Sequence, residues 1–208
     1  MISSDASRPD FCLASHSPRR RGLLEGLGVA FFVQAAGADV EEKVLAAGRG
    51  AEAEEVAISR ARIKGDSVVN ILRARGTLCP VLSADTVVHI DSEVLDKPTD
   101  EAEARRFLER LSGKEHGVVT AVWLYDGEKE HAVWRRTRVT FAQLSSRMID
   151  AYIRTGEPFD KAGGYGIQGV GGAMVSRIDG CYFNVVGLPI YDTAKLLTRI
   201  GYPWALNA

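Results

Sequence analysis

The middle of the chain holds an apolar, β-branched run that restricts how the protein can fold. It reads Val81-Leu82-Ser83-Ala84-Asp85-Thr86-Val87-Val88. A strand with one face in water alternates apolar and polar residues, whereas a strand covered on both faces stays apolar. We therefore expect a central strand here. Because an unpaired buried carboxylate is costly, a metal ion, a basic side chain or backbone donors must hold Asp85 within it.

Helical and extended patterns alternate along the rest of the chain, which is typical of an α/β domain. The predicted helices cover about 18–27, 51–75, 100–111, 145–154 and 189–200. The predicted strands cover 11–14, 29–33, a hairpin of 117–125 and 132–141, and two strands around Asp179-Gly180, while 35–42 is expected to be a loop. No repeat or linker divides the chain, so we expect one domain over 11–208 with a mixed sheet, preceded by a disordered extension over 1–10.

Charge and composition argue against nucleic-acid and membrane partners. The 208 residues carry a formal net charge of −1, so any anion must bind to a local cluster. No apolar run reaches the roughly 18 residues of a membrane span, and residues 1–10 are too polar for a signal peptide. Cys12, Cys79 and Cys181 are odd in number and lack metal-binding spacing, so we expect a reduced, cytoplasmic compartment.

A phosphate site is predicted near the N-terminus. The strand pattern Phe11-Cys12-Leu13-Ala14 runs into Ser15-His16-Ser17-Pro18-Arg19-Arg20-Arg21 at the start of a helix. Unpaired N–H groups and the positive end of the helix dipole favour an anion there, and proline suits the first helical position. Arginine adds paired donors that match phosphate oxygens.

Charged residues elsewhere could complete such a site. Glu41-Glu42 could supply a carboxylate for Mg²⁺, and a solvated acidic loop is the alternative. Lys64 and Lys97 are single cations that could bind phosphate or lie at the surface.

A glycine-rich stretch is the second strong feature, Asp160-Lys161-Ala162-Gly163-Gly164-Tyr165-Gly166-Ile167-Gln168-Gly169-Val170-Gly171-Gly172. Glycine lets a backbone come close to a ligand, and the stretch contains no Walker or dinucleotide-binding motif in its proper context. Gln168 could pair with an amide-like ring such as uracil because its side chain both donates and accepts. A flexible tight loop is the alternative.

Taken in order, these segments resemble the Maf family of nucleoside triphosphate pyrophosphatases. The resemblance covers about residues 11–200 and depends on seven segments, Leu13-Ala14-Ser15-His16-Ser17-Pro18-Arg19-Arg20, Ser83-Ala84-Asp85-Thr86-Val87-Val88, Leu95-Asp96-Lys97-Pro98, Leu111-Ser112-Gly113, Thr120-Ala121-Val122, residues 160–169 and Asn184-Val185-Val186-Gly187-Leu188-Pro189. It implies a fold similar to that of inosine triphosphatases, with a mixed, elongated sheet, flanking helices and two lobes around a cleft. It also implies hydrolysis between the α- and β-phosphates with a divalent metal.

The resemblance also implies roles for individual residues. The expected triphosphate ligands are Ser15, Arg20, Lys64 and Lys97. Asp85 is the expected proton acceptor and, with Glu42, the expected ligand of Mg²⁺ or Mn²⁺. The residues expected to select dTTP and UTP over 7-methyl-GTP are Arg19, Thr86 and Gln168. Arg21 is expected to lie at the surface.

Three alternatives remain open at this point. The helical lysine stands in Arg60-Ala61-Arg62-Ile63-Lys64-Gly65, where Arg62 is a second candidate phosphate ligand, and Glu41 is a second candidate beside Glu42. The alternative function is a catalytically weak nucleotide-binding regulator of cell division or septum formation. Family resemblance suggests a homodimer.

Overall fold

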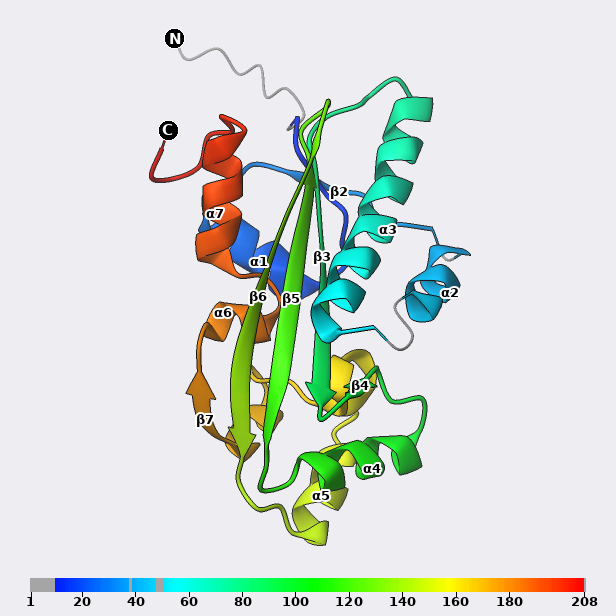
Figure 1. Cartoon of the computed structure of the whole chain (residues 1–208), viewed down its shortest axis with the longest axis vertical. Coiled ribbons are helices and arrows are strands. Elements are labelled where there is room, and N and C mark those ends of the chain that lie inside the picture. The colour runs from blue at the N-terminus through cyan, green and yellow to red at the C-terminus, as the bar shows by residue number, and fades with distance from the viewer. Residues whose placement is uncertain (1–9, 38, 48–50, 208) are drawn as a thin grey trace.

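A single mixed sheet organises the computed structural model, which describes residues 10–37, 39–47 and 51–207. Within these residues the strand order is β2-β1-β3-β5-β6-β7, with β4 paired to β3 (Figure 1). The strands are β1 Cys12–Leu13, β2 Phe32–Val33, β3 Val81–Ile90, β4 Glu93–Leu95, β5 Glu115–Tyr125, β6 Glu130–Phe141 and β7 Val175–Asp179. β1 pairs in parallel with β2 and β3, and the other pairs are antiparallel. The prediction of an α/β fold with a mixed sheet is confirmed.

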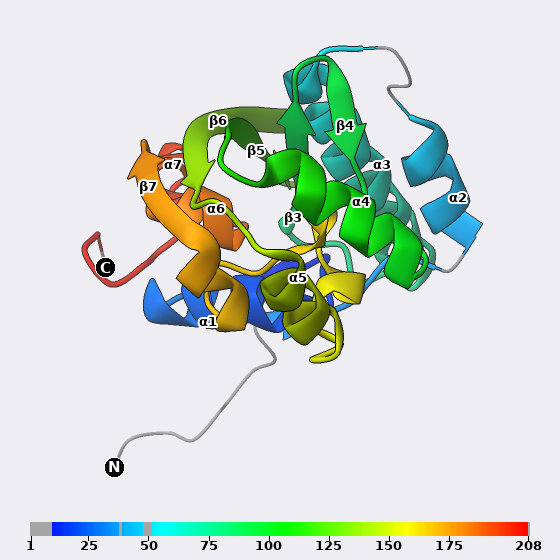
Figure 2. The same ribbon diagram turned by 90° about the horizontal axis from the view of Figure 1, so that it is seen from below.

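Helices surround this sheet. They are α1 Pro18–Gly26, α2 Asp39–Ala46, α3 Ala53–Ala74, α4 Glu101–Leu111, α5 Ser146–Ile153, α6 Tyr182–Val186 and α7 Ile190–Arg199, with short 3₁₀ turns at Glu157–Asp160, Ala162–Gly164 and Val170–Met174. Seen end-on, α1 and α3 lie on opposite sides of β3, and α4 and α5 lie at the near end (Figure 2). None of the described helices is both long and apolar enough to cross a membrane.

The central strand β3 contributes side chains to three hydrophobic cores formed by the described residues. Because side chains alternate across a strand, Val81 and Val87 pack with α3 in one core, whereas Leu82 and Ala84 pack with α1 and α7 in another. Val88 and Ile90 join the third core, with α4 and α5. β3 is therefore buried on both faces, as its sequence predicts.

One edge of β3 is left without a strand partner in its middle. β1 pairs with β3 at Val81 and Leu82, and β4 pairs with it at Val88–Ile90. Along the opposite edge, β5 pairs continuously from Val81 to His89. In the part of the chain that the structure describes, residues 83–87 thus present a gap in the sheet, and Asp85 and Thr86 stand at that gap.

Two predicted segments are wrong. Residues 39–42 were expected in a loop, but they begin helix α2, because Val40 and Val44 stand one turn apart and form a buried stripe. The second strand expected after Asp179-Gly180 is instead helix α6. The apolar run after Gly180 is too short for its periodicity to distinguish a strand from a helix. Gly180, with φ +129°, turns the chain before α6 begins. The strand expected over 29–33 is shorter, Phe32–Val33.

Residues 1–9 of the expected extension lie outside the described residues. Asp10 is exposed and accepts a hydrogen bond from the Tyr202 hydroxyl at 3.3 Å.

Candidate active site

A cavity of about 280 Å³ opens at the gap in the sheet. Its walls come from the loop before α1, from α1, α2, α3 and β3, from the loop after β4, and from the glycine-rich segment. Among the described residues, five cationic side chains line it, Arg19, Arg20, Lys64, Lys97 and Lys161. Asp85 and Asp160 are the lining carboxylates. The excess of positive charge favours an anionic ligand.

The loop before α1 has the geometry predicted for an anion site. Ser17 is the N-cap residue of α1, its Oγ accepts the N–H of Arg20 at 3.4 Å, and Pro18 opens the helix. Ser15 is buried, and its Oγ accepts the N–H of Ser17 at 3.2 Å. Both residues line the cavity at the positive end of the helix.

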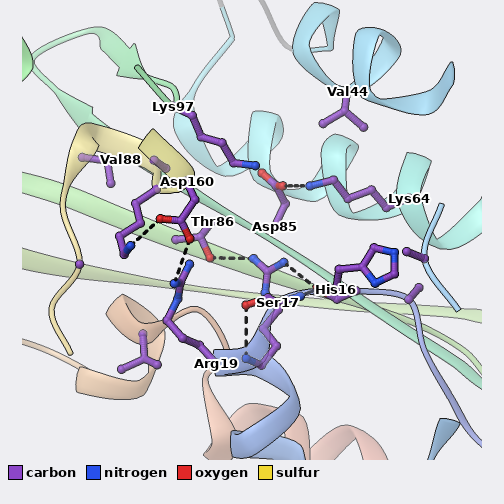
Figure 3. Close-up of a pocket in the computed structure, with 18 of the residues that line it drawn as sticks. His16, Ser17, Arg19, Val44, Lys64, Asp85, Thr86, Val88, Lys97 and Asp160 are labelled. Carbon is purple, nitrogen blue, oxygen red and sulfur yellow. Dashed lines mark hydrogen bonds and ion pairs between the residues drawn. The ribbon is translucent and has the colours of Figure 1, made fainter. Parts of the chain in front are cut away.

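The three arginines of this loop have different surroundings. Arg20 points inward, where burial lowers the pKa of its guanidinium from the ordinary value and the charge of Asp85 opposes that shift. Arg19 forms an ion pair with Asp160 at 3.6 Å across the cavity (Figure 3). Arg21 is exposed and pairs with Glu25 at 2.9 Å, which matches its expected surface position.

Asp85 is held by a basic side chain, one of the three partners that its burial required. Its carboxylate pairs with the ammonium of Lys64, which extends from α3. Lys97 points at Asp85 from the opposite side (Figure 3). Asp85 is 6% exposed and the Lys64 side chain 26%. A carboxylate between two ammonium groups, open to the cavity, can bind a cation or accept a proton.

The structure places Arg62 away from this cluster. Arg62 is exposed and pairs with Asp66 at 3.5 Å and with Glu130 at 2.9 Å. Lys64 lines the cavity and Arg62 does not, because two positions along a helix point to different sides. Of the two candidates on α3, Lys64 is therefore the one that lines the cavity.

An ion pair between a buried arginine and a partly exposed aspartate, which the sequence analysis missed, fixes the backbone next to Lys97. Arg60, 7% exposed, binds Asp96 with two hydrogen bonds of 2.5 and 3.2 Å, and Asp96 directly precedes Lys97. The carbonyl of Asp96 accepts the N–H of Gly163 at 3.1 Å. This contact connects α3, the loop after β4 and the glycine-rich segment. Arg60 and Asp96 stand 36 positions apart, so no local sequence pattern predicts that they pair.

Glu157 was also missed, and it organises the glycine-rich segment. Its carboxylate accepts the N–H groups of Val170 at 3.0 Å and Gly171 at 3.1 Å and the hydroxyl of Tyr152 at 2.9 Å. Burial favours the neutral acid, but these hydrogen bonds outweigh it and hold the pKa of Glu157 below its usual value. A Cβ on Gly169 would collide with this carboxylate, which explains the glycine there.

Two predicted site residues lie outside the cavity lining. Gln168 is exposed, although its neighbours Gly166 and Ile167 line the wall. Glu42 is exposed on α2, whereas Val40 and Val44 of the same helix face the cavity. Glu42 stands two positions from each valine and therefore on the opposite side of the helix. The side chain of Glu41, the other candidate, lies outside the described residues.

The residues at hand fit a divalent cation that a substrate helps to hold. Mg²⁺ in nucleotide sites takes one or two carboxylates and completes its shell with phosphate oxygens and waters. Asp85 provides one carboxylate at the cavity wall. The described residues contain no cluster of three or more His, Cys, Asp or Glu that could form a dedicated cage.

Together, the fold and the cleft are those of an α/β protein arranged to bind a polyanion beside a carboxylate. The chain belongs to the Maf family, since the model of the family described as "Maf-like protein" matches residues 10–200.

Several curated relatives are similar over nearly the full chain. The dTTP/UTP pyrophosphatase of Symbiobacterium thermophilum is 46% identical over 192 residues, which cover 92% of this chain and 94% of the relative. The proteins of the same name from Myxococcus xanthus and Anaeromyxobacter dehalogenans are 45% and 44% identical, over 92% and 94% of this chain and 92% and 96% of theirs. Among solved structures, the Ham1 protein of Staphylococcus aureus aligns with a TM-score of 0.46 at 11% identity, over 79% of each chain.

Proposed function

We propose that this protein hydrolyses dTTP and UTP to the nucleoside monophosphate and pyrophosphate. The observation that carries the proposal is a buried carboxylate, Asp85, set among cationic side chains in a cleft of about 280 Å³. The relatives named dTTP/UTP pyrophosphatase, 40–46% identical, supply the substrate class.

The triphosphate is proposed to lie against the start of α1. Ser15 and Arg20 bind phosphate oxygens there, at the positive end of the helix dipole. Lys64 and Lys97 bind from the other wall, where they flank Asp85. All four offset the negative charge that grows on the departing pyrophosphate.

Asp85 is proposed to activate the attacking water. Its Oδ1 accepts from Lys64, and Oδ2 takes a proton as the water oxygen bonds to the α-phosphorus and the bond to the bridging oxygen breaks. Pyrophosphate carries away the bonding electrons. Asp85 would hold Mg²⁺ or Mn²⁺ together with a carboxylate of α2, for which Glu42 is our candidate. When bound, the metal would neutralise phosphate charge and lower the pKa of a coordinated water.

Selection of the base is proposed to depend on Arg19, Thr86 and Gln168. Arg19 and Thr86 line the cavity. Gln168 stands just outside the lining, in a segment whose neighbouring residues form the wall. An amide that both donates and accepts suits a uracil or thymine ring.

The test separates binding from turnover. Asp85→Asn should lose at least about 100-fold in turnover of UTP while still binding UTP in calorimetry, because it removes the proton acceptor and keeps the shape. The control is Asp66→Asn, which makes the same exchange on the surface of α3 and should leave turnover unchanged. Full activity of Asp85→Asn would refute its role. Binding without any turnover by the unmodified protein would favour a nucleotide-binding regulator.

We also propose a homodimer, by family resemblance, and a cytoplasmic location, from the cysteine pattern. Light scattering on the purified protein tests the first, since a monomer at micromolar concentration would contradict it. Fractionation of cells tests the second.

A further inference from the structure

A continuous series of hydrogen bonds leads from Arg20 into the core behind the cavity. Arg20 Nη2 donates to Thr86 Oγ1 at 3.0 Å. Thr86 and Thr120 are partners in the β3–β5 register, and their hydroxyl oxygens lie 2.9 Å apart. Thr120 Oγ1 donates to the backbone carbonyl of Asn184 at 2.8 Å. Thr120 and Asn184 are fully buried, and nothing so far gives either a role.

The direction of every proton in this series is determined. A carbonyl can only accept, so the single hydroxyl proton of Thr120 must point to Asn184. Thr86 must then donate its own proton to Thr120, because two hydroxyl oxygens at 2.9 Å need one proton between them. Arg20 has only donors and supplies the bond that Thr86 accepts. Thr86 therefore has no proton to offer a substrate.

A second connection joins Arg20 to the same asparagine. Arg20 Nε donates to the carbonyl of Gly187 at 2.9 Å, three residues after Asn184 at the end of α6. The N–H of Gly187 in turn donates to the carbonyl of Asn184 at 3.1 Å. Gly187 has φ +121°, and a Cβ there would come within 3.3 Å of the Thr86 hydroxyl. Nε and Nη2 of Arg20 are thus held by Gly187 and Thr86, and each of these is connected by hydrogen bonds to the carbonyl of Asn184.

Asn184 is itself fixed to the sheet through its whole side chain. Its Oδ1 accepts the N–H of Thr120 at 3.0 Å. Its Nδ2 donates to the carbonyl of Val118 at 2.9 Å and to the hydroxyl of Thr137 at 3.0 Å. Since both amide protons and the amide oxygen are engaged, the group has one orientation, and it docks α6 on β5 and β6.

We propose that Thr120 and Asn184 are positioning residues that set the guanidinium of Arg20 for the triphosphate, and that Thr86 influences the substrate through Arg20. The inference rests on the proposed function, in which Arg20 binds phosphate. A guanidinium held at two nitrogens has a fixed plane, so its remaining N–H groups point to fixed places. Arg20 Nη1, which lies 3.4 Å from Ser15 Oγ, is one of the groups aimed in this way.

A double-mutant cycle with Arg20 tests this. Thr120→Val keeps the shape of the side chain and removes the hydroxyl, and we expect kcat/KM for UTP to fall roughly 10-fold, the size of coupling within a hydrogen-bonded network. Thr120→Ser keeps the hydroxyl and should restore kcat/KM to within about 2-fold. In an Arg20→Ala background, Thr120→Val should change kcat/KM by less than about 2-fold, because the group that it positions is absent.

The controls separate positioning from a general loss of structure. Thr193→Val removes another fully buried hydroxyl, which donates to the carbonyl of Pro189 at the N-cap of α7 and lies outside the series. This variant should leave kcat/KM unchanged. If Thr120→Val does not fold, Thr86→Val interrupts the series one position nearer to Arg20, and the same cycle applies. An equal loss from Thr120→Val with and without Arg20 overturns the inference. Unaltered activity of Arg20→Ala overturns both the phosphate role of Arg20 and the inference, whereas an impaired Arg20→Ala with an unimpaired Thr120→Val overturns the inference alone.

Discussion

Gly65 marks the closest approach of α3 to the sheet, and replacing it with alanine gives a sharp prediction. A Cβ at position 65 would lie inside van der Waals contact with the Trp123 ring and 2.8 Å from Ser83 Oγ. Trp123 is 2% exposed, and Ser83 Oγ is bonded to the carbonyl of Ala61 at 2.7 Å, so neither can move away easily. Overpacking of a core costs about 1–3 kcal/mol, and with both neighbours held we expect about 3.

Alanine also has a higher helix propensity, which returns about 1 kcal/mol in a helix interior. The expected net loss for Gly65→Ala is therefore about 2 kcal/mol, or roughly 4–8 °C in Tm for a chain of this size. Because Lys64 is the adjacent residue, displacement of α3 should also weaken the Lys64–Asp85 pair and lower turnover of UTP.

Thermal unfolding followed by circular dichroism measures the effect. The matched control is Gly22→Ala in α1, where a Cβ meets nothing within 4 Å, so the variant should gain about 1 kcal/mol of stability. The same exchange thus has opposite signs in two helices. A Tm of Gly65→Ala equal to or above that of the unmodified protein would refute the packing argument.

Three further predictions concern the site and its surroundings. Lys64→Met should lower kcat/KM for UTP about 100-fold, because it removes a cation that offsets the charge on the departing pyrophosphate. Arg62→Met, on the exposed side of the same helix, should change it less than about 2-fold. Glu42→Gln should raise the Mg²⁺ concentration for half-maximal rate at least about 10-fold. If only Glu41→Gln has this effect, the ligand is Glu41 and not Glu42. If neither variant changes the Mg²⁺ requirement, α2 supplies no metal ligand. Burial lowers the pKa of His116 to about 4, so between pH 6.5 and 4 the unfolded chain binds more protons than the folded protein. The free energy of unfolding should therefore decrease as the pH is lowered from 6.5 to 4, by up to about 3 kcal/mol. His116→Gln should flatten that part of a urea-unfolding profile, and an unchanged profile would contradict the assignment.

The sequence predicted best those elements whose pattern is local. The β-branched runs of β3 and β5, the alternation of β6, and the serine and proline at the start of α1 each carry their structure within a few residues. Several lining residues could be predicted for the same reason, because the loop before α1, the centre of β3 and the glycine-rich segment are each a short sequence motif.

What could not be predicted depends on contacts between distant positions. The holder of Asp85 stayed open among three kinds of partner, since the sequence does not show that Lys64 faces it from α3. Thr120 and Asn184, 64 positions apart, form two hydrogen bonds that no periodicity announces. Helix α2 was expected to be a loop because its acidic residues suggested a solvated or metal-binding turn, whereas burial of Val40 and Val44 decides its structure.

The orientation of Glu42 follows from that correction. In a loop, either glutamate could have turned toward Asp85. In a helix that directs Val40 and Val44 at the cavity, Glu42 stands on the other side. The Glu42→Gln variant described above tests whether α2 supplies the second carboxylate for the metal.

The central claim is that water attacks the α-phosphorus of a pyrimidine nucleoside triphosphate in the cleft around Asp85. Turnover of UTP with Mg²⁺ in ¹⁸O-labelled water, with the products separated and weighed by mass spectrometry, tests this most directly. We expect pyrophosphate without label and UMP with one labelled oxygen. Label in pyrophosphate would place the attack on the β-phosphorus, and orthophosphate with UDP as the first products would contradict the account.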